Sequence, residues 1–159
     1  MSAQDRPGEA ISAEGLKELR AELERLEGDA RRQMAKRILA ARELGDLKEN
    51  AEYHIAKEDQ AHLETRISRL AERLRNAVVT ETNTGSGVVG FGSIVHVVDG
   101  AGASRTFTLV GPTEADLRQG RLSIESPMAQ ALMGRAPGDD VHVSTPRGRQ
   151  TYRIERLGA

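Results

Sequence analysis

The chain contains no cysteine and no tryptophan, and aromatic residues make up only 3% of its 159 residues. The missing cysteines exclude a disulfide framework and any thiolate metal site. Because large rings are so scarce, there is little material for one thick hydrophobic core. The composition therefore favours long helices accompanied by a small sheet.

Long apolar runs are missing as well, because no stretch approaches the roughly 20 apolar residues of a membrane-spanning helix. Residues 1–9 are polar and lack the apolar core of a signal peptide. We therefore expect a soluble, cytoplasmic protein with no membrane partner. The formal net charge of -1 argues against bulk electrostatic attraction to nucleic acid, although it allows a local basic patch.

The two halves of the sequence differ in composition. Glycine is rare and charge is dense before about residue 78, whereas glycine, proline and β-branched residues are frequent after about residue 90. The polar, glycine-containing segment between them is typical of a linker. We predict an α+β protein with two domains. Residues 1–10 would form a polar extension, 11–79 an antiparallel coiled coil, 80–90 a linker, and 91–159 a small α+β domain.

The first half has the spacing of two helices. Ser12 is a suitable N-cap for the first. Its apolar positions lie three and four residues apart and then at wider steps: Leu16, Leu19, Leu23, Leu26, Ala30, Met34, Ile38 and Ala41. The seam of the second helix consists of Ala56, Leu63, Ile67, Leu70, Leu74 and Ala77. These patterns predict two arms of about 45 Å each, packed as a coiled coil that slackens beyond Leu26.

A short segment joins the two arms. Gly45 is predicted to end the first helix in the left-handed conformation. Asp46 is predicted to begin the second, with Glu49 completing a capping box. So short a connection makes the helices antiparallel.

The second half has the pattern of short strands with one helix. The expected strands cover residues 93–98, 106–110, 141–143 and 151–154, with turns at 99–102 and 146–148. Ser126 followed by Pro127 is typical of a helix start, and the helix should run to residue 133 and end at Gly134.

Carboxylates are concentrated where the helices meet, at Asp46, Glu49 and Glu52. If the second helix began at Asp46, then Asp46 and Glu49 would lie on nearly one face. Such a pair suits Mg²⁺, which often takes one or two protein oxygens and completes its shell with water and phosphate. Two carboxylates do not complete an active site, so another molecule would have to supply the rest. The alternative interpretation is that both acids only cap the helix.

Two other clusters of charged or metal-binding side chains lie on the predicted helices. The basic residues Arg31, Arg32, Lys36 and Arg37 could follow a phosphate backbone, or they could be a solvated helix face. His54, Glu58 and His62 form a row on the second helix, but the histidines lie roughly 12 Å apart, too far to share one metal ion. No glycine-rich phosphate loop, nucleophile elbow or helical His-x-x-x-His pair appears, so the sequence does not predict an independent enzyme.

Two separate segments resemble the bacterial Gre transcript-cleavage factors of the GreA type. Residues 45–54 (GDLKENAEYH) are similar to the signature of that family, and residues 123–134 (SIESPMAQALMG), followed by Gly138 and Asp139, are similar to its C-terminal motif. Residues 111–116 (GPTEAD) also fit. The resemblance extends from about residue 11 to residue 157, and the segment before residue 11 is longer than the family leads us to expect.

The resemblance implies an antiparallel coiled coil followed by an FKBP-like domain that docks at the rim of the RNA polymerase secondary channel. The coiled coil would reach the active centre, where acids at its tip help to hold a second Mg²⁺ jointly with the polymerase. The polymerase would then cleave its own backtracked RNA near the 3′ end. The factor would thus stimulate a nuclease activity without being an enzyme by itself.

The resemblance also assigns residues to roles. The catalytic and metal-binding acids would be Asp46 and Glu49. The supporting tip residues would be Asn50, Glu52 and Tyr53. The polymerase-docking residues would be Glu125, Ser126 and Pro127. The candidates for contact with the nascent RNA are Arg31, Arg32, Lys36 and Arg37.

Two other functions remain open at this point. Gre-like proteins with the same architecture include regulators that bind the channel without stimulating cleavage. An FKBP-like domain could also act as a prolyl isomerase or chaperone. However, Phe91, Phe107 and Tyr152 are the only phenylalanine or tyrosine residues in this half of the chain, which has no tryptophan. They are too few to favour a proline pocket walled by aromatic residues.

Overall fold

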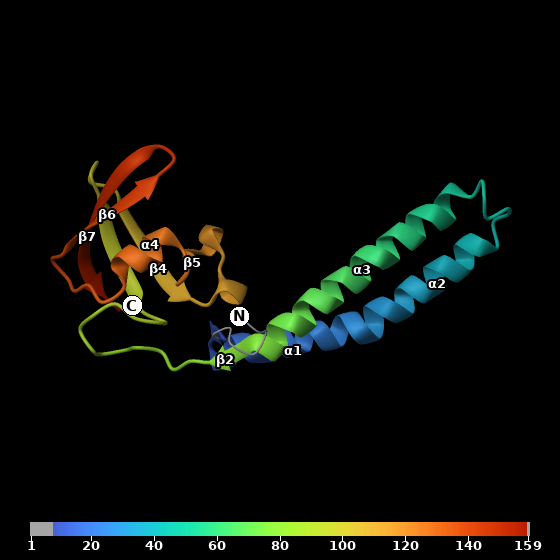
Figure 1. The fold of residues 1–159 in the computed structure, drawn as a ribbon, viewed down its shortest axis with the longest axis horizontal. Helices are drawn as coiled ribbons and strands as arrows, with labels where there is room; N and C mark the ends of the chain where they lie inside the picture. The colour runs from blue at the N-terminus through green and yellow to red at the C-terminus, as the bar shows by residue number, and fades with distance from the viewer. Residues whose placement is uncertain (1–7, 159) are drawn as a thin grey trace, which may run out of the picture. The chain divides into compact units, whose positions relative to one another are not determined.

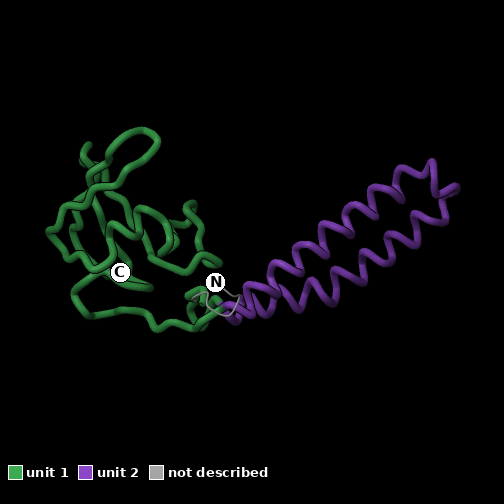
Figure 2. The backbone as a smooth tube through the Cα atoms, viewed as in Figure 1, with its two compact units in different colours: residues 1–15, 77–159 green, residues 16–76 purple. Residues whose placement is uncertain are grey.

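The computed structural model describes residues 8–158, and within them it separates a helical unit from a strand-rich unit (Figures 1 and 2). The helical unit comprises residues 16–76, and the strand-rich unit comprises the segments before and after it. The predicted α+β organisation, with a helical hairpin followed by a strand-rich domain, is confirmed. Most of the predicted extension, residues 1–7, lies outside the described residues.

The first arm of the hairpin is helical from Ala13 to Arg42, in three parts. α1 (Ala13–Arg25) is followed by a π-helical turn, η2 (Leu26–Ala30), and then by α2 (Arg31–Arg42). The Ser12 hydroxyl accepts a hydrogen bond from the Gly15 N–H at 3.0 Å, as predicted for an N-cap. The π turn lies where the apolar spacing widens. One extra residue in that turn shifts the face that the helix presents to its partner, which fits the wider spacing.

The second arm is one helix, α3 (Ala51–Asn76), which lies alongside α2 (Figure 1). Leu23, Leu26 and Ile67 are the buried centre of the seam. Nearer the tip, the buried side chains are one isoleucine and two alanines: Ile38, Ala41 and Ala56. A hairpin this thin buries little apolar surface. Polar contacts between the arms therefore make a larger relative contribution to its stability.

The strand-rich unit contains two sheets. A small parallel pair joins β1 (Glu9–Ile11) to β2 (Ala77–Val79). The main sheet has the order β5-β4-β3-β7-β6. Its strands are β3 (Ile94–Asp99), β4 (Ser104–Val110), β5 (Arg121–Ser123), β6 (Asp140–Thr145) and β7 (Gly148–Leu157). All neighbours in it are antiparallel except β4 and β5.

The main sheet packs its core against α4 (Pro127–Leu132). The buried cluster includes Val95 and Val97 of β3, Leu109 of β4, Leu132 of α4 and Ile154 of β7. Two short 3₁₀ turns, η3 (Pro112–Glu114) and η4 (Leu117–Gln119), connect β4 to β5.

The predicted coiled coil, residues 11–79, is wider than the helical unit, because its last residues form β2, which pairs with β1. β1 also takes in Glu9 and Ala10, which we predicted as part of the polar extension. Both strands have three residues, too few to show the alternation by which a strand is identified in a sequence. Within the predicted linker, Val89 and Gly90 are buried, and Val89 exchanges backbone hydrogen bonds with residues 134 and 135. The end of this segment therefore packs as part of the strand-rich unit.

Candidate functional site at the hairpin tip

The tip connection, residues 43–50, joins α2 to α3 and carries both candidate acids. The prediction that the second helix begins at Asp46 is wrong, because α3 begins at Ala51. Asp46 instead forms a local turn, in which its Oδ1 accepts a hydrogen bond from the Lys48 N–H at 3.0 Å. Gly45 lies within the connection with a φ of 140°, three residues past the end of α2, and is not the helix C-cap that we predicted. The acids therefore lie on a turn and not on one face of a helix.

Asn50 explains why the helix starts late. Its Oδ1 accepts a hydrogen bond from the Tyr53 N–H at 3.1 Å, the geometry of an N-cap. Its Nδ2 donates to the Ala41 carbonyl, 2.5 Å away in the last turn of α2. One side chain thus caps α3 and satisfies a carbonyl at the end of α2. The sequence assigned Asn50 to the supporting stretch, and the structure gives it this double contact.

Aromatic contacts surround the base of the tip connection. The ring of Tyr53 is half-buried, and the Arg42 guanidinium carbon lies 5.7 Å from its centroid, within reach of a cation–π contact. The Tyr53 ring also meets the His54 ring edge-on, with centroids 5.7 Å apart. Sequence reasoning did not single out Arg42, because its partner lies across the turn and no local spacing relates the two.

The two candidate acids point into solvent. Asp46 and Glu49 are both exposed, and no residue among 8–158 pairs with the Glu49 carboxylate. The described part of the chain contains no group of three or more His, Cys, Asp or Glu residues that could hold a metal ion. The donors present are thus two carboxylates, one of which has an oxygen already bonded to a backbone N–H. This set fits a Mg²⁺ ion only if another molecule supplies the remaining ligands.

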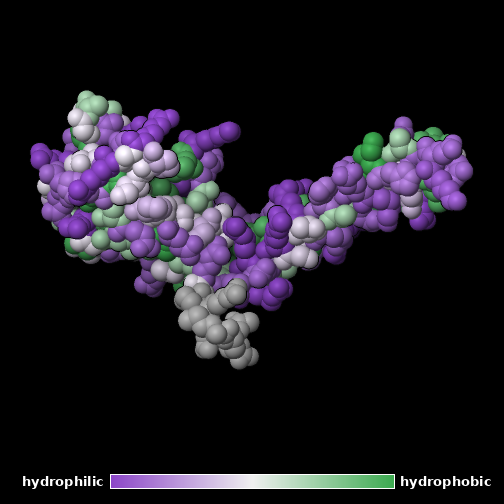
Figure 3. Space-filling view, turned by 45° about the horizontal axis from the view of Figure 1, so that its top comes forward, coloured by the Kyte–Doolittle hydropathy of each residue, from purple (hydrophilic) through white to green (hydrophobic). Residues whose placement is uncertain are grey.

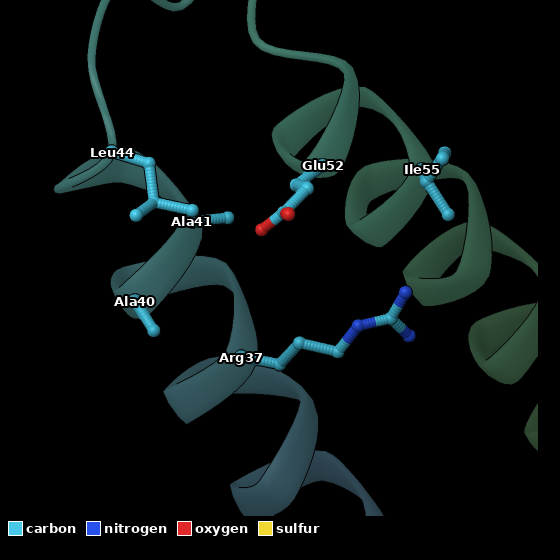
Figure 4. Close-up of a pocket in the computed structure, with 6 residues that line it drawn as sticks. All are labelled: Arg37, Ala40, Ala41, Leu44, Glu52 and Ile55. Atoms are coloured by element: carbon cyan, nitrogen blue, oxygen red, sulfur yellow. The ribbon is translucent and has the colours of Figure 1, made fainter.

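Glu52, the third acid of the tip, lies in the first turn of α3 and lines a groove between the arms. The groove has a volume of about 370 Å³ and is also lined by Arg37, Ala40, Ala41, Leu44 and Ile55. Figure 4 shows the Glu52 carboxylate directed toward α2 and the Arg37 side chain reaching toward α3. Exposed apolar side chains lie in the same region, namely Leu39, Leu44, Leu47 and Ile55. Figure 3 shows green, hydrophobic surface near the end of the hairpin.

The predicted RNA-binding cluster is mostly occupied by ion pairs. Arg31 forms two hydrogen bonds with Glu64 across the hairpin, at 2.9 and 2.8 Å. Arg37 donates to Asp59, also on α3, at 2.6 Å. Arg32 pairs with Asp29 on its own arm. Lys36 has no described partner. All four side chains remain exposed, so they are accessible to a phosphate backbone, but two of them also connect the arms.

The row of histidines does not form a metal site. The His62 Nε2 lies 3.9 Å from a Glu58 oxygen on the solvent side of α3, and both side chains are largely exposed. His54 turns the other way along the helix and contacts the tip connection at Lys48.

The Arg31–Glu64 pair predicts an acid-sensitive hairpin. The hydrogen bond from Arg31 lowers the pKa of Glu64 below its ordinary value of 4.5. The folded state thus binds this proton more weakly than the unfolded state does. The stabilisation is present above pH 4.5 and is lost as the pH falls through the lowered pKa. Thermal melts of the wild type and Glu64→Gln, followed by circular dichroism, should differ at pH 7 and converge below pH 4.5.

The effect of Glu64→Gln should be small, because both partners are solvent-exposed. Glu24→Gln is the matched control, since Glu24 is an exposed glutamate of α1 without a described partner. A melting difference for Glu64→Gln that stays constant from pH 7 to pH 3 would contradict the ion-pair explanation.

The predicted docking residues lie at the start of α4. The Ser126 hydroxyl accepts a hydrogen bond from the Ala129 N–H at 3.2 Å and donates to the Ser123 carbonyl at 2.7 Å. Pro127 occupies the first helical position, as predicted. Glu125 and Pro127 are exposed, whereas Ser126 is half-buried. Ser126 is thus a structural cap, and its exposed neighbours are the side chains available to a partner.

Ser126→Ala should separate capping from docking. Losing the cap should destabilise the strand-rich unit by about 1 kcal/mol in denaturant unfolding. Ser126→Thr should restore most of that stability, because a threonine hydroxyl can also accept from the Ala129 N–H and donate to the Ser123 carbonyl. If Ser126→Thr is as unstable as Ser126→Ala, the hydroxyl does not act as the cap. Polymerase affinity should follow stability in both variants if Ser126 contributes only through the helix.

Comparisons with known proteins match most of the chain. The family described as "Transcription elongation factor, N-terminal" matches residues 9–79, and the family described as "Transcription elongation factor, GreA/GreB, C-term" matches residues 83–157. Transcription elongation factor GreA of Nautilia profundicola is 44% identical over 151 residues, covering 94% of this chain and 93% of the relative. GreA of Bacillus subtilis is 40% identical, covering 92% and 94%.

A solved structure also matches. Gfh1 of Thermus aquaticus is 29% identical, with 97% of this chain and all of that chain covered, at a TM-score of 0.45. Within residues 8–158, no helix is long and apolar enough to cross a membrane. The family matches and the identity to the two GreA proteins show that this chain belongs to the GreA/GreB family of transcription elongation factors.

Proposed function

We propose that this chain binds RNA polymerase at its secondary channel and stimulates the Mg²⁺-dependent cleavage of backtracked RNA by the polymerase itself. As a member of a transcription elongation factor family, the chain acts on RNA polymerase. The proposal that the chain stimulates cleavage rests on the structure of the hairpin tip. Asp46 and Glu49 are exposed on a turn whose backbone is held by side-chain hydrogen bonds.

The two acids supply half of a metal site. When a Mg²⁺ ion is bound, it supplies Lewis-acid chemistry that activates water and stabilises charge on a phosphoryl group. The second oxygen of Asp46 and both oxygens of Glu49 are free to act as ligands or to orient a water molecule. The polymerase would provide the remaining ligands, so the chain would stimulate catalysis without being an enzyme by itself.

The remaining contacts follow from exposure and charge. The exposed Glu125 and Pro127 beside the α4 N-cap are available to a polymerase surface. Lys36, together with the exposed guanidiniums of Arg31, Arg32 and Arg37, would contact the nascent RNA near its 3′ end. An approach by RNA would compete with the Glu64 and Asp59 carboxylates for two of these guanidiniums.

A cleavage assay tests the proposal. RNA polymerase would be stalled in a backtracked complex with labelled, 3′-extended RNA and Mg²⁺ at neutral pH, and this protein would then be added. Release of short 3′ fragments, well above the rate of polymerase alone, is the expected result. Binding without cleavage at any Mg²⁺ concentration would refute the proposal in favour of a non-cleaving channel regulator.

A prolyl isomerase activity has less structural support. Phe91 is buried, and Phe107 and Tyr152 pack against the core of the strand-rich unit. These rings are therefore largely used in packing, which leaves little aromatic surface to enclose a proline. Turnover in a proline-peptide assay would overturn this judgement.

A further inference from the structure

The peptide units around Lys48 are held from two sides. Lys48 lies between the two candidate acids, and its N–H donates to Asp46 Oδ1 at 3.0 Å. Its carbonyl oxygen lies 3.3 Å from His54 Nε2, on the first turns of α3. The Lys48 carbonyl belongs to the peptide unit that leads directly into Glu49. Fixing that carbonyl therefore restricts the backbone rotation that aims the Glu49 side chain.

We propose that His54 is a positioning residue, which holds the Lys48 carbonyl and thereby the direction in which Glu49 is presented. This inference deepens the proposed cleavage function and rests on it for the role of Glu49. Without the contact, rotation about the Lys48 Cα–C and Glu49 N–Cα bonds would carry the carboxylate over a wider range. A carboxylate that must meet a metal ion held mostly by another protein gains from being confined in advance.

The donor comes from a rigid position. The backbone N–H of His54 donates to the Asn50 carbonyl at 3.2 Å, so His54 belongs to the first hydrogen-bonded turn of α3. Its ring meets the Tyr53 ring edge-on. Tyr53 is itself covered by the Arg42 guanidinium from the other arm. The imidazole is thus supported by neighbours that lie in the two helices and not in the turn.

The chemistry of the contact identifies the nitrogen that matters. A carbonyl oxygen only accepts, so Nε2 must carry the proton. Both the neutral Nε2–H tautomer and the imidazolium ion provide that proton, so the contact does not need a charged ring. The amide nitrogen of glutamine reaches about as far from Cα as Nε2 does, whereas that of asparagine matches the nearer Nδ1. His54→Gln should therefore keep the contact, and His54→Asn should lose it.

The contact can be measured in the free protein. The {¹H}–¹⁵N heteronuclear NOE reports fast backbone motion at each amide. In the wild type, Lys48 and Glu49 should have values close to those of α3. His54→Asn and His54→Ala should lower both values, while His54→Gln should not. Unchanged values in His54→Ala would overturn the inference. His62→Ala, at an exposed histidine two turns along the same helix, is the control and should change nothing at the tip.

The functional consequence is measured in the stalled-polymerase assay. At saturating protein, His54→Asn and His54→Ala should cleave about fivefold more slowly, the effect of losing one hydrogen bond worth about 1 kcal/mol. The protein concentration giving half-maximal cleavage should not change, and His54→Gln should restore the rate. Equal rates for all variants would refute the positioning role. If the wild type does not cleave, the proposed function fails, and the NOE comparison still decides whether His54 fixes the tip.

Discussion

Asp46→Asn combined with Glu49→Gln should reduce stimulated RNA cleavage by about 100-fold or more and leave polymerase binding almost unchanged. A loss of this size is typical when groups that stabilise charge in the transition state are removed from a preorganised site. Both substitutions keep the size of the side chain and remove its charge. The amide oxygen introduced by Asp46→Asn would still accept the Lys48 N–H, so the turn should persist. The rate of fragment release and the affinity of a labelled protein for the stalled complex are the two measurements.

A charge-matched control separates the tip acids from general electrostatics. Glu43→Gln combined with Glu58→Gln also removes two negative charges from exposed positions close to the tip. Neither carboxylate is proposed to bind Mg²⁺ or to hold the turn, so this double variant should cleave like the wild type. If the Asp46/Glu49 variant retained cleavage, the proposed roles of these acids would be wrong. If both double variants lost cleavage equally, only the local charge of the hairpin end would matter.

The polymerase also provides an internal check. Its own slow cleavage without the factor should be unaffected by any change in this chain. Raising the Mg²⁺ concentration should restore at most part of the rate of the Asp46/Glu49 variant. Mass action can refill a weakened metal site, but it does not replace the lost negative charge.

The architecture was predictable from the sequence where local chemistry determines it. The caps at Ser12 and Ser126 are confirmed, because each needs only a hydroxyl at the right distance from a nearby N–H. The apolar periodicity likewise indicated both arms of the hairpin. These features depend on residues within one or two helical turns, which a sequence displays directly.

The start of α3 was not predictable in the same way. Asp46 and Asn50 are both good N-cap residues, and a capping box favoured Asp46. The structure uses Asn50, whose amide also bonds the Ala41 carbonyl on the opposite arm. That second contact exists only once the arms are side by side, so the choice between two equivalent local signals is made by tertiary structure. The short strands β1 and β2 were missed for another reason, because three residues are too few to show the alternation of a strand.

In the candidate site too, local sequence features were predictable and contacts between distant residues were not. The family signature located the acids, but not the contacts that shape the turn around them. The basic cluster was recognised, yet its cross-arm partners Glu64 and Asp59 lie 33 and 22 residues away in the sequence. Charge spacing along one helix cannot indicate which carboxylates of another helix will pair with it.

Leu109→Ala should destabilise the strand-rich unit by about 2–5 kcal/mol, the largest stability effect that we expect from a single substitution. Leu109 is fully buried near the end of β4. Truncating it removes apolar contacts and leaves a cavity among side chains of β3, β7 and α4 that cannot easily close. Amide hydrogen exchange at Val95 and Val97, two β3 residues of the same buried cluster, measures the free energy of opening directly.

The same substitution also connects stability to function. The buried cluster around Leu109 consists entirely of residues of the strand-rich unit, and it includes Ala129 and Leu132 of α4. The exposed Glu125 and Pro127, which we propose meet the polymerase, are presented by the start of that helix. Leu109→Ala should thus weaken polymerase binding on warming, while exchange at Ile67 in the hairpin stays unchanged. Leu117→Ala, at a leucine that is 73% exposed, should alter stability by no more than about 0.5 kcal/mol. Equal destabilisation at Val97 and Ile67 would show instead that the two units unfold together, and the loss of binding could then not be attributed to the docking helix.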